Sequence, residues 1–155
     1  MIDAFIDHED ERRILRLYAL YCHFFAHGDP EDWVSIFTPD GVFEKRNASQ
    51  GGLGTSAQTV QGHAALRDMT LGRRTMFRNQ VRHQQTDIVI TPGTDPDHAV
   101  GKSLILVTDW RSGAGRLAAL GSCDATFRRM TEGWRFARIT LSSLPLPAAP
   151  GQDVK

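Results

Sequence analysis

The sequence lacks an excess of either charge: 18 lysines and arginines balance 18 aspartates and glutamates, so the formal net charge at pH 7 is zero. A chain without net charge has no general attraction for polyanions, which disfavours nucleic acid and an anionic membrane surface as partners. No apolar run approaches the roughly 18 residues that cross a bilayer, and the first residues carry no basic, apolar leader. We therefore expect a cytoplasmic protein that binds neither nucleic acid nor a membrane.

Metal and cofactor motifs are also missing. Cys22 and Cys123 form neither a CxxC motif nor a zinc-ligand pattern, so we expect free, buried thiols rather than a disulfide. GxGxxG, P-loop and HExxH patterns are absent as well. His23 and His27 have the i, i+4 spacing that can hold a metal, but no nearby third ligand completes the set, and a solvated helix end explains them better. The sequence thus implies no metal and no cofactor.

The length and the local patterns bound the architecture. A chain of 155 residues suits one domain over residues 1–155, because a single core of this size already buries roughly two-thirds of the unfolded surface. The proline-rich tail, 145–155, is expected to be loosely ordered. A long helix is predicted over residues 8–26, because its apolar residues share one stripe of a helical wheel. The stripe comprises Ile14, Leu17, Tyr18, Tyr21, Phe24 and Phe25.

A second, short helix should follow directly. Gly28 predicts the end of the first helix, and Asp29 with Pro30 predicts the cap and first turn of the next. This helix would end at 38–40, and its apolar side would comprise Trp33, Ile36 and Phe37.

The middle of the chain mixes strand, loop and helix signals. Residues 41–46 predict a first strand, and 47–60 has loop composition without an apolar period, which makes it a candidate mobile lid. A third, short helix is predicted over 62–73.

Four longer strands complete the pattern. The turn sequences PGTDPD, RSGAG and TEG separate them, as is typical of antiparallel neighbours. They are predicted at 82–91, 99–110, 117–130 and 134–144. The result is an α+β fold with helices on one face of an antiparallel meander. Because SLILV at 103–107 is apolar on both faces, we expect the second face to meet another copy in a homodimer or a higher homo-oligomer.

Several motifs occur in a fixed order along residues 9–144: a helix with YCxxxxxGD, a tryptophan, F-x-PD-x-x-F-E, G-x-x-A-L, RHxxxD and a last hairpin ending in GWRF. In this order they resemble the nuclear transport factor 2-like superfamily, and within it the SnoaL-like proteins grouped with polyketide cyclases, scytalone dehydratase and ketosteroid isomerase. The small subunit of aromatic-ring dioxygenases is a further relative. The resemblance implies a cone, in which a strongly curved sheet wraps around the first helix and an apolar cavity forms the usual active site.

The resemblance also assigns two candidate catalytic residues. Tyr21 is similar to the oxyanion-hole tyrosine of ketosteroid isomerase, and His83 of RHxxxD is similar to the pocket histidine of dehydratase-like members. An imidazole titrates near neutral pH and can give or take a proton, whereas a structural histidine is the alternative interpretation. A tyrosine hydroxyl can donate to a carbonyl oxygen as charge develops, or Tyr21 is an ordinary core residue of the apolar stripe.

Three positions depart from the family pattern. Ala26 stands where many SnoaL-like enzymes keep an aspartate, and Lys45 stands where the isomerase keeps its general base. The isomerase's second pocket acid falls near Ala125 or Thr126. The isomerase mechanism is therefore disfavoured, and dehydration or cyclisation fits better.

Other candidate residues would complete the site. Apolar walls are expected from Trp33, Phe37, Phe43 and Phe127. Asp109 and Cys123 would line the sheet side of the cavity, with Cys123 packing rather than reacting, because no Cys-His motif is present.

Asp87 follows His83 by four residues, on the same strand face but about 13 Å away, so the two form no direct pair unless a bulge intervenes. Asp87 would orient a ligand hydroxyl or pair with Arg82 or Arg138.

A basic cluster lies between the third helix and the strand that follows, and comprises Arg73, Arg74, Arg78 and Arg82. Such a cluster contacts a carboxylate, a phosphate or a coenzyme A tail, or it is a solvated edge, which is the commoner case.

Two functions follow from these observations. The first is a cofactor-independent dehydratase, cyclase or isomerase that acts on an apolar, oxygenated ring compound, with His83 as general acid or base and Tyr21 polarising a carbonyl. The second is a non-catalytic ligand-binding or assembly module that resembles the dioxygenase small subunit, and Ala26 is its main support.

Overall fold

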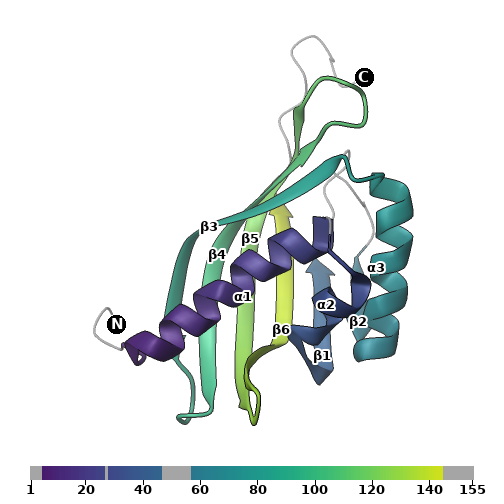
Figure 1. Cartoon of the computed structure of the whole chain (residues 1–155). Helices are drawn as coiled ribbons and strands as arrows, with labels where there is room; N and C mark the ends of the chain where they lie inside the picture. The colour runs from purple at the N-terminus through teal and green to yellow at the C-terminus, as the bar shows by residue number, and fades with distance from the viewer. Residues whose placement is uncertain (1–4, 27, 47–56, 145–155) are drawn as a thin grey trace.

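A computed structural model describes residues 5–26, 28–46 and 57–144. The elements in chain order are α1 (His8–Ala26), α2 (Pro30–Ser35), β1 (Phe37–Arg46), β2 (Gln58–Gln61), α3 (His63–Phe77), β3 (Val81–Pro92), β4 (His98–Asp109), β5 (Arg116–Met130) and β6 (Gly133–Leu144). Figure 1 shows α1 lying across one face of the sheet, with α2 and α3 on the side where β1 and β2 lie. The predicted α+β architecture, a long helix against a curved, open sheet, is confirmed.

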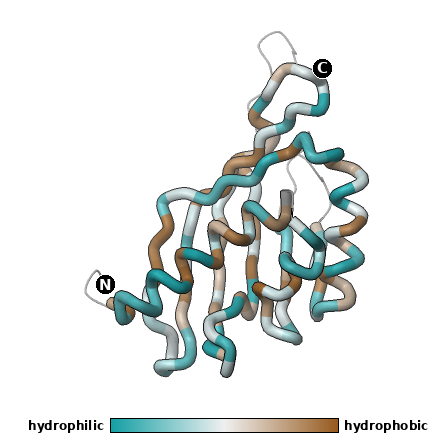
Figure 2. The backbone as a smooth tube through the Cα atoms, in the orientation of Figure 1, coloured by the Kyte–Doolittle hydropathy of each residue, from teal (hydrophilic) through white to brown (hydrophobic). Residues whose placement is uncertain are grey.

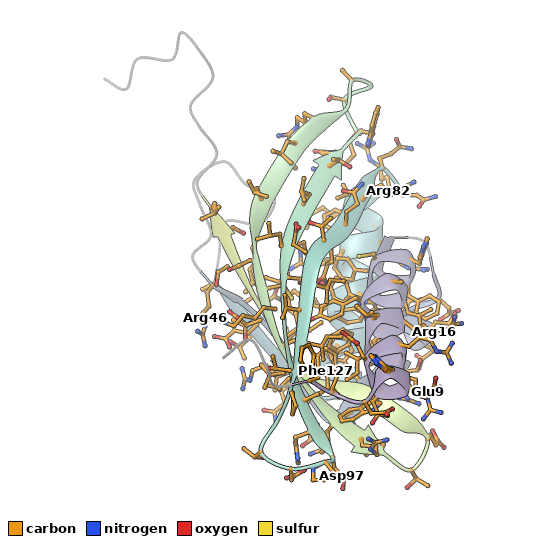
Figure 3. The ribbon with its side chains drawn as sticks, turned by 90° about the vertical axis from the view of Figure 1, so that its left-hand side faces the viewer. Glu9, Arg16, Arg46, Arg82, Asp97 and Phe127 are labelled. Atoms are coloured by element: carbon orange, nitrogen blue, oxygen red, sulfur yellow. The ribbon has the colours of Figure 1, made fainter. Side chains whose placement is uncertain are left out.

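Helix α1 forms where it was predicted. The carboxylate of Asp7 accepts a 3.0 Å hydrogen bond from the backbone N–H of Glu9, and acidic side chains occupy the first turn, where the helix dipole favours them. Five of the six stripe residues are buried, and Phe24 is partly buried. Figure 2 shows hydrophobic and hydrophilic segments alternating along this helix, and in Figure 3 Glu9 and Arg16 point away from the sheet.

Helix α2 begins as predicted but ends earlier. Asp29 caps it by accepting a 2.8 Å hydrogen bond from the backbone N–H two residues later. The helix ends at Ser35, and Phe37 already belongs to β1, so the prediction that placed Phe37 in a helix was wrong. The physical reason is sheet pairing: the carbonyl oxygen of Ile36 accepts a 2.9 Å hydrogen bond from the N–H of Phe136 in β6.

The six described strands form one sheet in the order β2-β1-β6-β5-β4-β3. Neighbours pair antiparallel, as the turn sequences indicated, except that β1 and β6 run parallel. Strand β2 begins within the predicted loop 47–60 and pairs antiparallel with β1, so the loop prediction was wrong for residues 58–60. Residues 47–56 of the candidate lid and the tail 145–155 lie outside the described residues.

Two backbone irregularities occur in this part of the chain, one directly after α3 and one within β3. Helix α3 continues to Phe77, beyond the predicted end, and stops where Arg78 adopts a left-handed conformation with φ of 47°. In β3 the register with β4 shifts between Thr86 and Val89, and Asp87 has φ of 52°. The second irregularity is a bulge, which breaks the two-residue alternation of this strand.

Aromatic side chains fill the core between α1 and the sheet. The rings of Trp33 and Phe37 lie 4.7 Å apart between centroids, and those of Phe127 and Phe136 lie 4.8 Å apart. Tyr18 of α1 meets Phe127 edge-on at 5.6 Å. Figure 3 shows Phe127 among the side chains between the helix and the sheet. No helix among the described residues is both long and apolar enough to cross a membrane.

Candidate functional site

A cavity lies beside the C-terminal part of α1, between this helix, α3 and the sheet. Its lining residues surround about 500 Å³ of space not filled by atoms, part of it open to solvent, of which about 40 Å³ is accessible to the centre of a water molecule. Most lining groups are apolar, and they come from seven elements. The lining consists of Tyr21, Phe25, Phe43, Lys45, Arg73, Phe77, His83, Ile105, Val107, Ala119, Leu120, Gly121, Leu141 and Ser143.

Both residues predicted to be catalytic line this one cavity. His83 comes from β3 and Tyr21 from α1, and the ring of Phe25 contacts both: its centroid is 4.8 Å from the imidazole and 5.7 Å from the phenol ring. The structure thus brings the two side chains together across one phenylalanine, although they are far apart in the sequence.

The imidazole of His83 is held neutral. Burial, and then the positive charges of Arg73 and Lys45, lower its pKa from the ordinary 6.5 to about 3. Its Nδ1 atom is buried and has no hydrogen-bond partner among the described residues. A neutral imidazole offers one donor and one acceptor nitrogen, so a bound ligand or water can engage it.

The hydroxyl of Tyr21 is likewise available. The side chain is fully buried, and the hydroxyl has no partner among the described residues. Burial raises the pKa of this hydroxyl well above its ordinary value, so the group stays protonated and can donate. An unmet buried hydroxyl costs folding free energy, which a ligand acceptor would recover.

Arg73 reaches the cavity from α3. Its Nη2 atom donates a 2.8 Å hydrogen bond to Oε1 of Gln58, and its guanidinium lies 5.9 Å from the ring centroid of Phe25 and 5.8 Å from that of Phe43. Burial lowers its pKa from the ordinary value, but arginine stays charged in proteins.

Lys45 reaches the same cavity from β1. Lys45 is 8% exposed. Burial, and to a smaller extent the positive charge of Arg73, lower the pKa of its ammonium group. Sequence reasoning noted Lys45 only as a missing base and Arg73 only as part of a basic cluster. The alternation of Phe43 and Lys45 along β1 was the signal that both face inward, because residues two apart share a strand face.

The charge of the lining is one-sided. Among the described residues that line the cavity, Arg73 and Lys45 carry positive charge and none is an aspartate or glutamate. In surroundings this apolar, charges are screened far less than in water. The charged side chains of the described lining are therefore all basic.

The other predicted wall residues divide between cavity and core. Phe43 lines the cavity, whereas Trp33, Phe37 and Phe127 lie in the buried aromatic core and do not line it. Cys123 is a buried free thiol outside the lining, and burial raises the pKa of this thiol to about 12, in keeping with a packing role.

The two predicted carboxylates lie elsewhere. Asp109 ends β4 and accepts hydrogen bonds from Arg111 and Arg116, so it does not line the cavity as expected. Asp87 is exposed at the bulge of β3, where it accepts a 2.8 Å hydrogen bond from the hydroxyl of Thr86. Neither of the two arginines considered as its partner pairs with it: Arg138 donates to Glu44, and Arg82 donates to backbone oxygens.

The remaining candidates do not gather into a site. His23 is exposed and free of any cluster of three metal-ligating groups in the described part of the chain, and His27 lies outside that part. Of the four clustered arginines only Arg73 lines the cavity, while Arg82 donates to the backbone oxygens of Asn79 and Val81. Ala26 is the last residue of α1.

Comparison with known proteins places this geometry in context. The family model of the SnoaL-like domain matches residues 7–140, and none of the curated proteins matches the chain. A Mycobacterium tuberculosis protein of unknown function is 27% identical, with a TM-score of 0.75 over 96% of this chain and 84% of that one.

Two structures from Novosphingobium aromaticivorans share the fold. A nuclear transport factor 2-like protein with a cystatin-like fold is 24% identical, with a TM-score of 0.74 over 88% of this chain and 82% of that one. The β subunit of a proposed aromatic-ring-hydroxylating dioxygenase is 22% identical, with a TM-score of 0.69 over 89% of this chain and 91% of that one.

Proposed function

This chain belongs to the SnoaL-like domain family, and from that premise we propose that it is a cofactor-independent enzyme of the dehydratase, cyclase or isomerase type. Its substrate is an apolar, oxygenated ring compound bound beside Tyr21 and His83. One observation carries the proposal: Tyr21 and His83 line the same apolar cavity, and the buried Tyr21 hydroxyl and the buried Nδ1 atom of His83 have no hydrogen-bond partner among the described residues. Pockets of this kind, with few polar groups on apolar walls, are typical of small-molecule sites.

The two side chains divide the chemistry. The neutral imidazole of His83 accepts a proton from the carbon next to a substrate carbonyl. Tyr21 donates a hydrogen bond to the carbonyl oxygen as negative charge develops there. The positive charges of Arg73 and Lys45 lower the affinity of the His83 imidazole for a proton. Negative charge on the bound substrate offsets this effect, so the proton affinity of the imidazole rises as that charge develops.

The space in the cavity sets a condition on the ligand. About 40 Å³ admits the centre of a water molecule, so a ring compound enters only with displacement of lining side chains. Arg73 and Lys45 have the longest and most rotatable side chains of the lining, and they are the groups we expect to move.

Turnover tests the proposal. A panel of β-hydroxy and unsaturated ring ketones is followed by absorbance with the wild-type protein and with His83→Ala, Tyr21→Phe and the exposed control His23→Ala. We expect His83→Ala to keep its circular dichroism spectrum and to lose turnover at least about 100-fold, while His23→Ala keeps it. Unchanged turnover in His83→Ala would remove the histidine from the mechanism.

Ala26 favours a second candidate function, a non-catalytic ligand-binding or assembly module. An alanine there lacks the acid that many relatives use, and one of the similar structures is described as a dioxygenase β subunit. In that case ligands bind in the cavity without turnover, and His83→Ala changes affinity alone. Binding without product over the whole panel would favour this function over the first.

The outer face of the sheet supports a homodimer. Val100, Leu104 and Leu117 lie on the face opposite α1 and are 36%, 44% and 42% exposed. Exposed apolar residues of this kind favour contact with a second copy of the chain. Analytical ultracentrifugation of the wild type and of Leu104→Lys tests this proposal, with dimer expected for the first and monomer for the second; a monomeric wild type would contradict it.

A further inference from the structure

We propose that the ligand of the cavity is an anion: a ring compound with a carboxylate that Arg73 and Lys45 bind while the ring lies against the apolar walls. This inference rests on the proposed function and names the substrate class of the same site. It follows from an arrangement that the motifs did not indicate. Two basic side chains from different elements, α3 and β1, enter one apolar cavity.

The neighbours of Arg73 leave its charge unbalanced. In the described part of the chain its hydrogen-bond and ring contacts are the amide oxygen of Gln58 and the rings of Phe25 and Phe43, none of which carries a negative charge. Removing a guanidinium from water is unfavourable, and partners without charge offset this cost only in part. A bound carboxylate would recover more, because it makes charge-assisted hydrogen bonds with this group.

The polar groups around the two cations point to the same kind of ligand. Tyr21 lines the cavity, and its buried hydroxyl has no acceptor among the described residues. A carboxylate offers several acceptor sites and no donor, which matches a site rich in donors. A metal ion or an ammonium ligand does not fit, since the described lining contains two cations and no carboxylate.

The walls define the rest of the ligand. Phe25, Phe43, Ile105, Val107 and Leu141 surround the polar groups with aromatic and aliphatic surface. Burying a ring against such surface is favourable by about 25 cal/mol per Å² of apolar area. A ring acid satisfies both parts of the site, whereas an inorganic anion uses only the cations and a neutral ring uses only the walls.

Matched probes test the inference in the intact protein. Benzoate and 2-naphthoate are compared with the uncharged amides of the same shape, benzamide and 2-naphthamide, by isothermal titration calorimetry at pH 7. We expect each acid to bind at least 10-fold more tightly than its amide. Inorganic phosphate should bind more weakly than 2-naphthoate, because it cannot use the apolar walls.

Variants locate the binding site. Arg73→Met and Lys45→Met remove the charges and keep similar volume, and each should reduce the preference for acid over amide at least 5-fold. Arg78→Met is the control, because this exposed arginine lies next to α3 but outside the lining. Equal binding of acid and amide by the wild type, no binding of either, or a preference that survives the double variant would overturn the inference.

The test separates the two proposals. It measures binding and needs no turnover, so a protein that prefers amides leaves the proposed reaction open for a neutral substrate. If the protein binds 2-naphthoate through Arg73 but converts no ring acid or ketone, the anion site is supported and the proposed reaction is contradicted.

Discussion

Gln58 lies next to both cations of the cavity. It is the register partner of Lys45 across strands β2 and β1, and its Oε1 atom accepts a 2.8 Å hydrogen bond from Nη2 of Arg73. Residues paired directly across an antiparallel ladder share a sheet face. A strand of four residues, which has loop composition in the sequence, therefore positions Arg73.

A carboxylate at position 58 should compete with the ligand. In Gln58→Glu the new side chain forms an ion pair with Arg73, so we expect the affinity for 2-naphthoate to fall about 10-fold or more. Gln58→Ala removes one hydrogen bond of about 1 kcal/mol, so the affinity for 2-naphthoate should fall only several-fold. Calorimetry measures both, and an affinity in Gln58→Glu equal to that of the wild type would argue against an anion site at Arg73.

His83 should make the folded state sensitive to mild acid. Its pKa is about 3 when folded and close to 6.5 when unfolded. The unfolded chain therefore binds more protons between these values, so stability is complete above the unfolded pKa and falls as the pH decreases towards 3. Burial, and then the charges of Arg73 and Lys45, lower this pKa, and the rings of Phe25 and Phe77 lie beside the imidazole.

Urea unfolding at pH 7, 6 and 5 measures this effect. The wild type should lose up to about 2 kcal/mol more than His83→Gln over this range. His8→Gln serves as a control, because the His8 side chain is fully exposed, and its pH dependence should follow the wild type. Parallel curves for the wild type and His83→Gln would show that His83 is protonated as readily in the folded state as in the unfolded one.

Asp109 should contribute to stability and not to ligand binding. This carboxylate is 3% exposed and accepts hydrogen bonds of 2.9 Å from Arg111 and from Arg116. The hydrogen bonds from Arg111, and then the charges of both arginines, hold its pKa far below the usual range. Asp109→Ala should destabilise the fold by about 2–3 kcal/mol, because two guanidinium groups lose their partner. The affinity for 2-naphthoate should stay within 2-fold of the wild type, since Asp109 does not line the cavity.

Asp124→Ala is the matched control for this variant. Asp124 is an exposed carboxylate of the neighbouring strand whose contact with Lys102 is 3.9 Å long, and its loss should cost less than about 1 kcal/mol. If the two variants unfold at the same urea concentration, the ion pairs of Asp109 do not stabilise the fold.

Gly101 allows α1 to approach the sheet closely. A Cβ atom at this position would lie 2.3 Å from the hydroxyl oxygen of Tyr18 and 2.9 Å from Cε2 of Phe127. Gly101→Ala should therefore destabilise the protein by about 1–3 kcal/mol through overpacking.

The control for Gly101 should change stability in the opposite direction. A Cβ at Gly72 in α3 would have no heavy atom within 4 Å, so Gly72→Ala should stabilise by about 0.4–1 kcal/mol by restricting the unfolded chain. Thermal unfolding of both variants measures the two effects. A stable Gly101→Ala protein would mean that Tyr18 can move without cost.

Local sequence patterns were sufficient to predict the structure where one physical preference dominated. The stripe of α1 was readable because apolar residues recur at the helical period, and the cap at Asp29 because its carboxylate acts within two residues. The order of motifs gave the family and placed Tyr21 and His83 in the same pocket, where the structure has both.

Local patterns failed where a distant strand decided the conformation. Phe37 has the spacing of a helical residue, but pairing with Phe136 places it in β1. Gln58 has loop-like neighbours, but pairing with Lys45 makes it part of a strand. The side chain of Asp87 departs from the face expected beside His83 because a bulge interrupts β3. Pairing partners and bulges depend on residues far away in the chain.

The sequence by itself determined the long amphipathic helix and the four long strands of the C-terminal half, because hydrophobic period and turn chemistry act over short distances. Tyr21 and His83 became candidates through the resemblance to a family. Only the tertiary structure decided which charges share the cavity. It brought Arg73 of α3 and Lys45 of β1 next to His83 and left Asp87 and Asp109 outside. Convergence of separate elements in space sets the electrostatic potential of a site, and no spacing along the chain encodes it.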